Sequence, residues 1–156
     1  MEVVRKTLQL QKPLLGICRG LQITNGYFGG TLIPGIPSRF HSCDHLTKTR
    51  KPCEHVITVR KNTLLRQIVP QQKGKVLSAH HQCVDKIGDG LRVNASAIKG
   101  IIEGMEWKNT KDKSLMLLLQ WHPERMKDQQ SNFSKNIRDY YLSEIRKMHG
   151  IYGNEI

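Results

Sequence analysis

The spacing of apolar residues changes several times along the chain, and each spacing predicts a different element. Residues 2–11 carry apolar side chains at helical intervals, and Pro13 follows where such a helix would end. The short apolar run at 14–17 is typical of a buried strand. Residues 19–28 predict a second helix, closed by the glycine pair at 29–30. The N-terminal part is therefore expected to form helix, strand, sharp turn and helix.

The later part of the chain is dominated by short runs that are typical of strands. These runs cover residues 55–59, 76–79, 91–97, 101–107 and 114–120. Residues 98–100 predict a hairpin turn, and residues 34–52 have no periodicity and predict a long surface loop. A basic amphipathic helix is expected over 132–148.

Charge and composition narrow the classes of protein. Lys and Arg number 25 against 13 Asp and Glu, which gives a net charge of +12, but the basic residues are dispersed and not interleaved with aromatic ones. Nucleic acid is therefore not the expected partner. The longest aliphatic run, 115–119, is too short to cross a bilayer, and the charged first dozen residues do not form a secretory signal. We expect a cytoplasmic protein that binds no membrane, with free thiols at its four cysteines.

The strongest chemical signal is a cysteine between two glycines, GICRG at 16–20, where the predicted strand meets a helix. This pattern is typical of a nucleophile elbow, in which a sharp turn leaves little room beside the nucleophile. The helix start is expected to lower the pKa of the Cys18 thiol, making it the most acidic of the four. The alternative is a buried core cysteine.

A second signal follows the apolar strand at 115–119, where the chain continues as QWHPE over 120–124. A thiol nucleophile needs a base, and the base needs an acceptor that fixes its tautomer. His122 and Glu124, held by the proline between them, can supply both. A surface loop with an incidental histidine is the alternative for this segment alone, whereas both segments together predict a Cys18-His122-Glu124 triad.

Residues 41–45 and 53–55 contain His, Cys, Asp and Glu, which are the residue types of a competing metal site. His41 and His45 would share a face only on a helix, and the proline-rich surroundings and the lack of a CxxC pair favour a polar loop. We therefore expect no metal ligands and no cofactor.

Five motifs together resemble the class I glutamine amidotransferase superfamily, and more narrowly its γ-glutamyl-γ-aminobutyrate hydrolase or peptidase C26 branch. They are KPLLGICRGLQ (12–22), GGTL (29–32), SAHHQ (78–82), GLRV (90–93) and QWHPE (120–124). The resemblance implies a three-layer α/β fold, flavodoxin-like, with a mostly parallel sheet, and we expect a smaller antiparallel portion over 91–107. It also implies that residues 1–156 form one incomplete domain that lacks the family's first βα units.

The resemblance further implies roles for individual residues. Cys18 would attack a γ-glutamyl carbonyl and form a thioester, His122 would act as base and then acid, and Glu124 would orient it. The backbone N–H of Arg19 would stabilise the oxyanion. The side chains expected to bind the small-molecule γ-glutamyl substrate, with ordinary packing as their alternative, are Gln22, His81 and Gln82.

The expected absence of the first βα units leaves alternatives open. A second oxyanion donor normally comes from that part of the fold, and one such donor contributes about 10²–10³ in rate. The chain could instead be a catalytically impaired interaction or regulatory module for an acidic partner, or a glutaminase half that delivers ammonia to a synthase. We also expect association with a second copy or with a complementing chain, because the sheet would otherwise be left uncovered.

Overall fold

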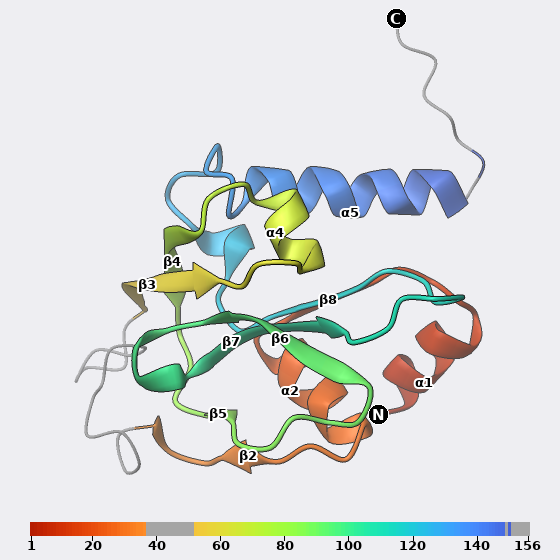
Figure 1. The fold of residues 1–156 in the computed structure, drawn as a ribbon, viewed down its shortest axis with the longest axis horizontal. Coiled ribbons are helices and arrows are strands. Elements are labelled where there is room, and N and C mark those ends of the chain that lie inside the picture. Colours follow the sequence, from red (N-terminus) through yellow and green to blue (C-terminus); the bar gives the residue numbers. More distant parts are fainter. Residues whose placement is uncertain (37–51, 149, 151–156) are drawn as a thin grey trace, which may run out of the picture.

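The computed structural model describes residues 1–36, 52–148 and 150 (Figure 1). Most of the predicted loop at 34–52, including His41, Cys43 and His45 of the competing metal motif, lies outside these residues. The helices are α1 (Glu2–Gln9), α2 (Arg19–Tyr27), α4 (Leu64–Ile68) and α5 (Lys135–Met148), with single 3₁₀ turns η1 (Ile98–Gly100) and η2 (Pro123–Arg125). The strands are β1 (Leu14–Ile17), β2 (Leu32–Ile33), β3 (Cys53–Val59), β4 (Lys73–Ser78), β5 (Cys83–Val84), β6 (Leu91–Ser96), β7 (Ile102–Trp107) and β8 (Met116–Leu119).

The main sheet has the strand order β1-β8-β7-β6-β3-β4, and β2 pairs with β5 separately. β1 and β8 are parallel, with Ile17 opposite Leu119. The other pairings of the main sheet are antiparallel. The α/β class is confirmed, but the described sheet is mixed, which corrects the expectation of a mostly parallel one. For β6–β7 and β7–β8 the physical reason is the short connection, because parallel neighbours need a long crossover.

Two apolar cores lie on opposite faces of the main sheet, and β8 contributes to both. Leu117 and Leu119 pack in the core that contains Ile137 of α5. Met116 and Leu118 pack in the core that contains Leu21 of α2. Figure 1 accordingly shows α5 and α4 on one side of the sheet and α2 on the other. This arrangement has three layers and explains why β8 is a continuous apolar run.

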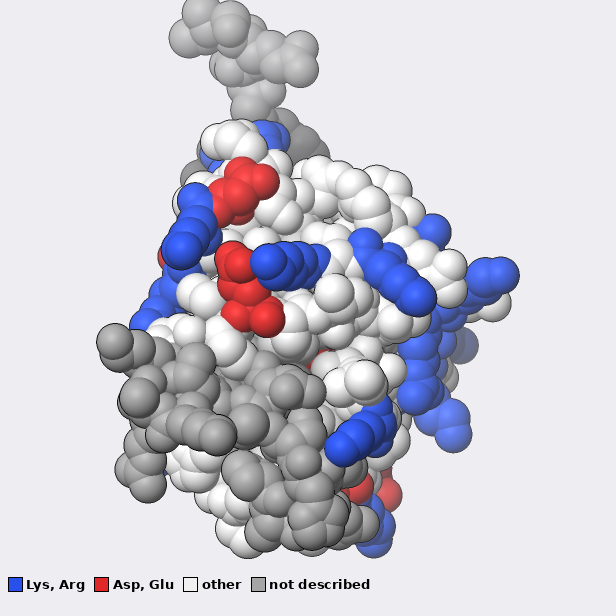
Figure 2. Space-filling view, turned by 90° about the vertical axis from the view of Figure 1, so that its left-hand side faces the viewer, with Lys and Arg blue, Asp and Glu red and all other residues white. Residues whose placement is uncertain are grey.

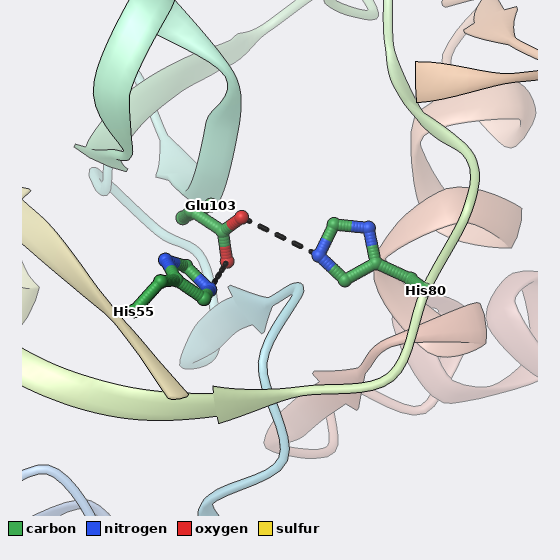
Figure 3. Close-up of side chains that lie close together, drawn as sticks. All are labelled: His55, His80 and Glu103. Carbon is green, nitrogen blue, oxygen red and sulfur yellow. Dashed lines mark ion pairs between the residues drawn. The ribbon is translucent and has the colours of Figure 1, made fainter. Parts of the chain in front are cut away.

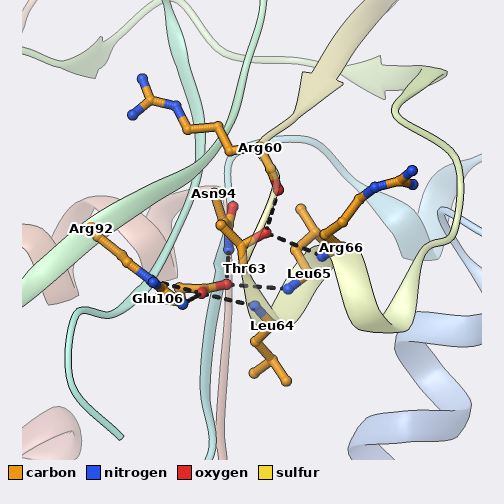
Figure 4. A network of polar contacts seen from close by, with 8 residues as sticks. All are labelled: Arg60, Thr63, Leu64, Leu65, Arg66, Arg92, Asn94 and Glu106. Carbon is orange, nitrogen blue, oxygen red and sulfur yellow. Dashed lines mark hydrogen bonds and ion pairs between the residues drawn. The ribbon is translucent and has the colours of Figure 1, made fainter.

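Short helix α4, which the sequence pattern did not predict, is held by a buried carboxylate on β7 (Figure 4). Glu106 is 1% exposed. It accepts hydrogen bonds from the backbone N–H groups of Leu64 (2.9 Å) and Leu65 (3.2 Å) and from the side chains of Arg92 (2.6 and 3.0 Å) and Asn94 (3.1 Å). The carboxylate therefore satisfies the first turn of α4 and is itself balanced by a guanidinium.

Two surface properties bear on partners. Among the described strands, β1 is paired on one side only, with β8. Val3 on α1 and Leu10 just after this helix are largely exposed. Figure 2 shows Lys and Arg side chains distributed over several parts of one face, with acidic groups among them. None of the described helices combines the length and apolar character that a bilayer crossing requires.

Candidate active site

Cys18 occupies a strained backbone position between β1 and α2, with φ 49° and ψ −99°. Its N–H donates to the carbonyl oxygen of Leu119 at 2.7 Å, which extends the β1–β8 pairing by one residue. A Cβ on Gly16 would lie 2.7 Å from Leu118 and 3.1 Å from the backbone of Gly20, so the close approach of strand and helix requires this glycine. A Cβ on Gly20 would meet nothing within 4 Å, so the second glycine is not required by crowding. The turn has the geometry expected of a nucleophile elbow.

His122 and Glu124 form a close pair just beyond the end of β8. The Nδ1 atom of His122 lies 2.7 Å from Oε1 of Glu124, and the two side chains are 15% and 48% exposed. The His122 backbone N–H donates to the carbonyl of Leu77 at 2.8 Å, which ties this segment to β4. Because the carboxylate accepts the hydrogen on Nδ1, Nε2 is left as the nitrogen that can accept a proton. Because β1 and β8 are parallel neighbours, Cys18 and His122 both follow the carboxyl ends of adjacent strands.

Burial raises the pKa of the Cys18 thiol above its ordinary value. The backbone N–H of Arg19 and the side chain of Gln120 act in the opposite direction, while the carboxylates of Glu124 and Glu103 add to the increase. The expectation of a pKa lowered by the helix start is therefore wrong, because desolvation of the thiolate outweighs the nearby donors. Near neutral pH the thiol is protonated, and a base has to remove its proton before it can attack.

A polar chain connects the nucleophile to the residues that were expected to bind substrate. Gln120 Nε2 lies 3.5 Å from Cys18 Sγ, and Gln120 Oε1 accepts a hydrogen bond from Gln22 Nε2 at 3.2 Å. Gln22 also donates to the carbonyl of Gln82 at 3.3 Å. Gln22, Gln82 and Arg19 line one surface hollow beside α2. Motif QWHPE contained Gln120, but its contact with the thiol was not predicted.

His81 differs from its neighbours in this segment. It is exposed and is not among the residues that line the hollow, although its carbonyl accepts the Ile36 N–H at 2.8 Å. The structure therefore brings Gln22 and Gln82 together but leaves the His81 side chain facing solvent.

The model of one protein family matches residues 1–124 of the chain, the family described as peptidase C26. The chain belongs to this family. YvdE of Lactococcus lactis, a protein named glutamine amidotransferase-like, is 34% identical over 127 residues, which is 80% of this chain and 51% of that protein. PuuD of Escherichia coli, named γ-glutamyl-γ-aminobutyrate hydrolase, is 28% identical over 80% of this chain and 50% of its own.

This peptidase C26 member thus spans about half the length of those curated relatives. Among solved structures, a glutamine amidotransferase from Thermotoga maritima superimposes with a TM-score of 0.62 at 16% identity, over 95% of this chain and 54% of the other. A glutamine amidotransferase from Methylobacillus flagellatus gives 0.60 at 12% identity, over 91% and 47%. These similarities confirm the α/β fold of class I glutamine amidotransferases.

A buried cluster that sequence reasoning missed lies behind this site. It consists of His55 on β3, His80 after β4 and Glu103 on β7 (Figure 3). In the sequence, His55 lies next to the loop motif and His80 lies in the SAHHQ motif, and neither pattern indicates that they meet. The available signal for Glu103 was its place in an apolar strand, where a carboxylate needs a specific reason to be buried.

Proposed function

We propose that this protein hydrolyses γ-glutamyl amides through a γ-glutamyl thioester on Cys18. The observation that carries the proposal is the left-handed elbow of Cys18 at the end of β1, beside the end of β8 that leads to the His122–Glu124 pair. A half-buried nucleophile, an oriented base and a nearby hollow are parts that thiol acyl transfer uses.

In the proposed reaction, His122 Nε2 takes the proton of the Cys18 thiol, and Sγ attacks the γ-carbonyl carbon of the substrate. The oxyanion receives a hydrogen bond from the Arg19 backbone N–H at the start of α2. The C–N bond then breaks, and the amine leaves with the proton from His122. Water, deprotonated by His122, attacks the thioester and releases the γ-carboxylate product and the thiol.

The raised pKa of the Cys18 thiol supports a general-base mechanism, because little thiolate is present before substrate arrives. Oε1 of Glu124 lies 2.7 Å from Nδ1 of His122, so the imidazolium that forms during attack has an acceptor beside it. Gln22 and Gln82 are proposed to bind the α-amino and α-carboxylate groups of the substrate from the hollow that Arg19, the residue after the nucleophile, also lines.

The test is to incubate the protein with γ-glutamyl-γ-aminobutyrate, γ-glutamyl-p-nitroanilide and glutamine, and to follow release of the amine. Peptide mapping of quenched samples should find one γ-glutamyl group on Cys18, and Cys53→Ser should behave like the unsubstituted protein. Reaction with glutamine alone would favour the glutaminase alternative. Absence of both adduct and amine with all three substrates would favour the non-catalytic module.

We propose a second copy of this chain as a partner at the edge strand β1. A groove beside this edge is lined by Leu15, Ile17, Ile137, Tyr141 and Leu142, so apolar side chains accompany backbone groups that can pair. Light scattering at micromolar concentration should detect a dimer, and Leu142→Lys should weaken it. A monomer at all concentrations would contradict the proposal.

A further inference from the structure

The cluster of His55, His80 and Glu103 is almost entirely removed from water. The three side chains are 8%, 2% and 0% exposed. They come from β3, from the turn after β4 and from β7, so only the folded sheet brings them together (Figure 3). A carboxylate at such a depth is costly unless a positive charge lies beside it.

The tautomer of His80 shows which atom faces the carboxylate. Its Nδ1 lies 2.8 Å from the carbonyl oxygen of Gln82, and a carbonyl can only accept, so Nδ1 carries the hydrogen. Neutral His80 therefore directs the lone pair of Nε2 toward Oε1 of Glu103, 3.4 Å away. Two acceptors held face to face in a buried site are stabilised by either a shared proton or a metal ion between them. Donation of the second ring N–H to a backbone carbonyl is also the usual arrangement of a metal-bound histidine.

The distances favour a metal ion over a shared proton. Nε2 of His80 lies 3.4 Å and Nε2 of His55 lies 3.8 Å from the oxygens of Glu103. A charge-assisted hydrogen bond would bring these atoms to about 2.7–2.9 Å. Neighbouring donors around a tetrahedral Zn²⁺ at about 2.0–2.1 Å lie roughly 3.4 Å apart. The three candidate donor atoms all lie within 4.8 Å of one another.

We propose that His55, His80 and Glu103 bind one divalent transition-metal ion, with Zn²⁺ as the best match. Two imidazoles and one carboxylate are a donor set that Zn²⁺ uses in proteins, and imidazole also suits Cu²⁺ and Ni²⁺. The Ser78 hydroxyl forms a hydrogen bond of 2.8 Å with His55 Nε2, and a bound ion would replace this contact. This proposal does not depend on the proposed hydrolase activity.

The metal site would act on the shape of the substrate hollow without touching substrate. The Glu103 carbonyl accepts the Gln120 N–H at 2.7 Å, and Gln120 contacts the nucleophile. The Gln82 carbonyl accepts from both His80 and Gln22. A bound ion would therefore hold β3, β7 and the turn after β4 in fixed positions behind the hollow.

The first experiment uses the unsubstituted protein. After treatment with a chelator and dialysis, Zn²⁺ titration by calorimetry should give one site per chain. The Tm should rise by about 5–10 °C when free Zn²⁺ is about 100 times its Kd. Co²⁺ should give the visible absorption of a tetrahedral site without a thiolate charge-transfer band. Failure to bind one ion, or a thiolate band, would overturn the proposal.

Two variants locate the site and one serves as a matched control. His80→Gln and His55→Gln should each weaken Zn²⁺ binding by about 10²-fold or more, because each removes one of three ligands. His81→Gln carries the same substitution at the adjacent, exposed position and should leave the affinity unchanged. Equal affinity in the His80 variant would overturn the proposal. So would a doubly protonated His80 imidazolium in nuclear magnetic resonance spectra of protein saturated with Zn²⁺.

Discussion

Two histidine–carboxylate pairs in this molecule have the same composition and opposite surroundings. His122 and Glu124 lie 2.7 Å apart, and the Glu124 side chain is 48% exposed. His80 and Glu103 lie 3.4 Å apart, and Glu103 is fully buried. The first pair is separated by one residue in sequence, whereas the second joins β7 to the turn after β4.

This difference in burial predicts different roles for the two pairs. Water screens the His122–Glu124 pair, so it contributes little to stability, and the role proposed for it is to orient the imidazole. Water does not reach Glu103, so its charge has to be balanced inside the protein and its loss has to affect the fold. The two pairs contain the same residue types, so the different roles proposed for them rest on burial.

The largest effect is expected on activity, from a substitution in the more exposed pair. His122→Gln removes the base for both formation and hydrolysis of the thioester, so kcat/KM should fall by about 10⁴-fold. The free energy of unfolding should change by less than about 1 kcal/mol. Steady-state release of amine and urea denaturation measure the two quantities, with Cys18→Ala as the inactive baseline. Activity within tenfold of the unsubstituted protein would exclude His122 as the base.

The buried pair should show its effect in stability. In protein saturated with Zn²⁺, Glu103→Gln removes one of the three proposed ligands, so the free energy of unfolding should fall by about 3 kcal/mol, which corresponds to a loss of about 10²-fold in metal affinity. Glu124→Gln is the matched control and should cost less than about 1 kcal/mol. Urea denaturation followed by circular dichroism compares them. Equal losses in the two variants would break the proposed distinction between the pairs.

A smaller effect is expected from Glu124→Gln on activity. Without the carboxylate, the Nδ1 hydrogen of His122 is no longer fixed and the imidazolium is less stabilised, so kcat should fall by roughly 10²-fold. KM should change little, because Glu124 is not proposed to touch the substrate. A change confined to KM would place Glu124 in the binding hollow instead.

The smallest effect concerns the pH dependence of the nucleophile. Because the pKa of the Cys18 thiol is raised, the thiolate forms only at higher pH than in the unfolded chain. Near neutral pH, iodoacetamide should therefore label Cys18 more slowly in the folded protein than in urea. The labelling rate of the folded protein should keep rising at pH values above the ordinary pKa range of thiols. In Glu124→Gln the rise should shift to lower pH, since that carboxylate contributes to the raised pKa. Peptide mapping of timed samples gives both profiles, and faster labelling of the folded protein would contradict this.

The amino-acid sequence was sufficient to predict the individual helices and strands and the turn at Cys18. Helical spacing, Pro13 and the glycines were enough to predict α1, β1, the elbow and α2, because backbone sterics and periodicity act over a few residues. The proximity of His122 to Glu124 followed from their separation by one proline. The strand runs at 55–59, 76–79, 91–97 and 101–107 were likewise found, with boundaries shifted by one to three residues.

The relative direction of paired strands and the burial of individual groups depend on the tertiary structure, so local sequence patterns did not predict them. The mixed sheet depends on short connections whose paths are not encoded in local spacing. Helix α4 depends on Glu106, which lies about forty residues further along the chain. The raised pKa of Cys18 and the meeting of His80 with Glu103 both depend on burial. Burial is a property of the packed layers and not of any single segment, so no local pattern carries it.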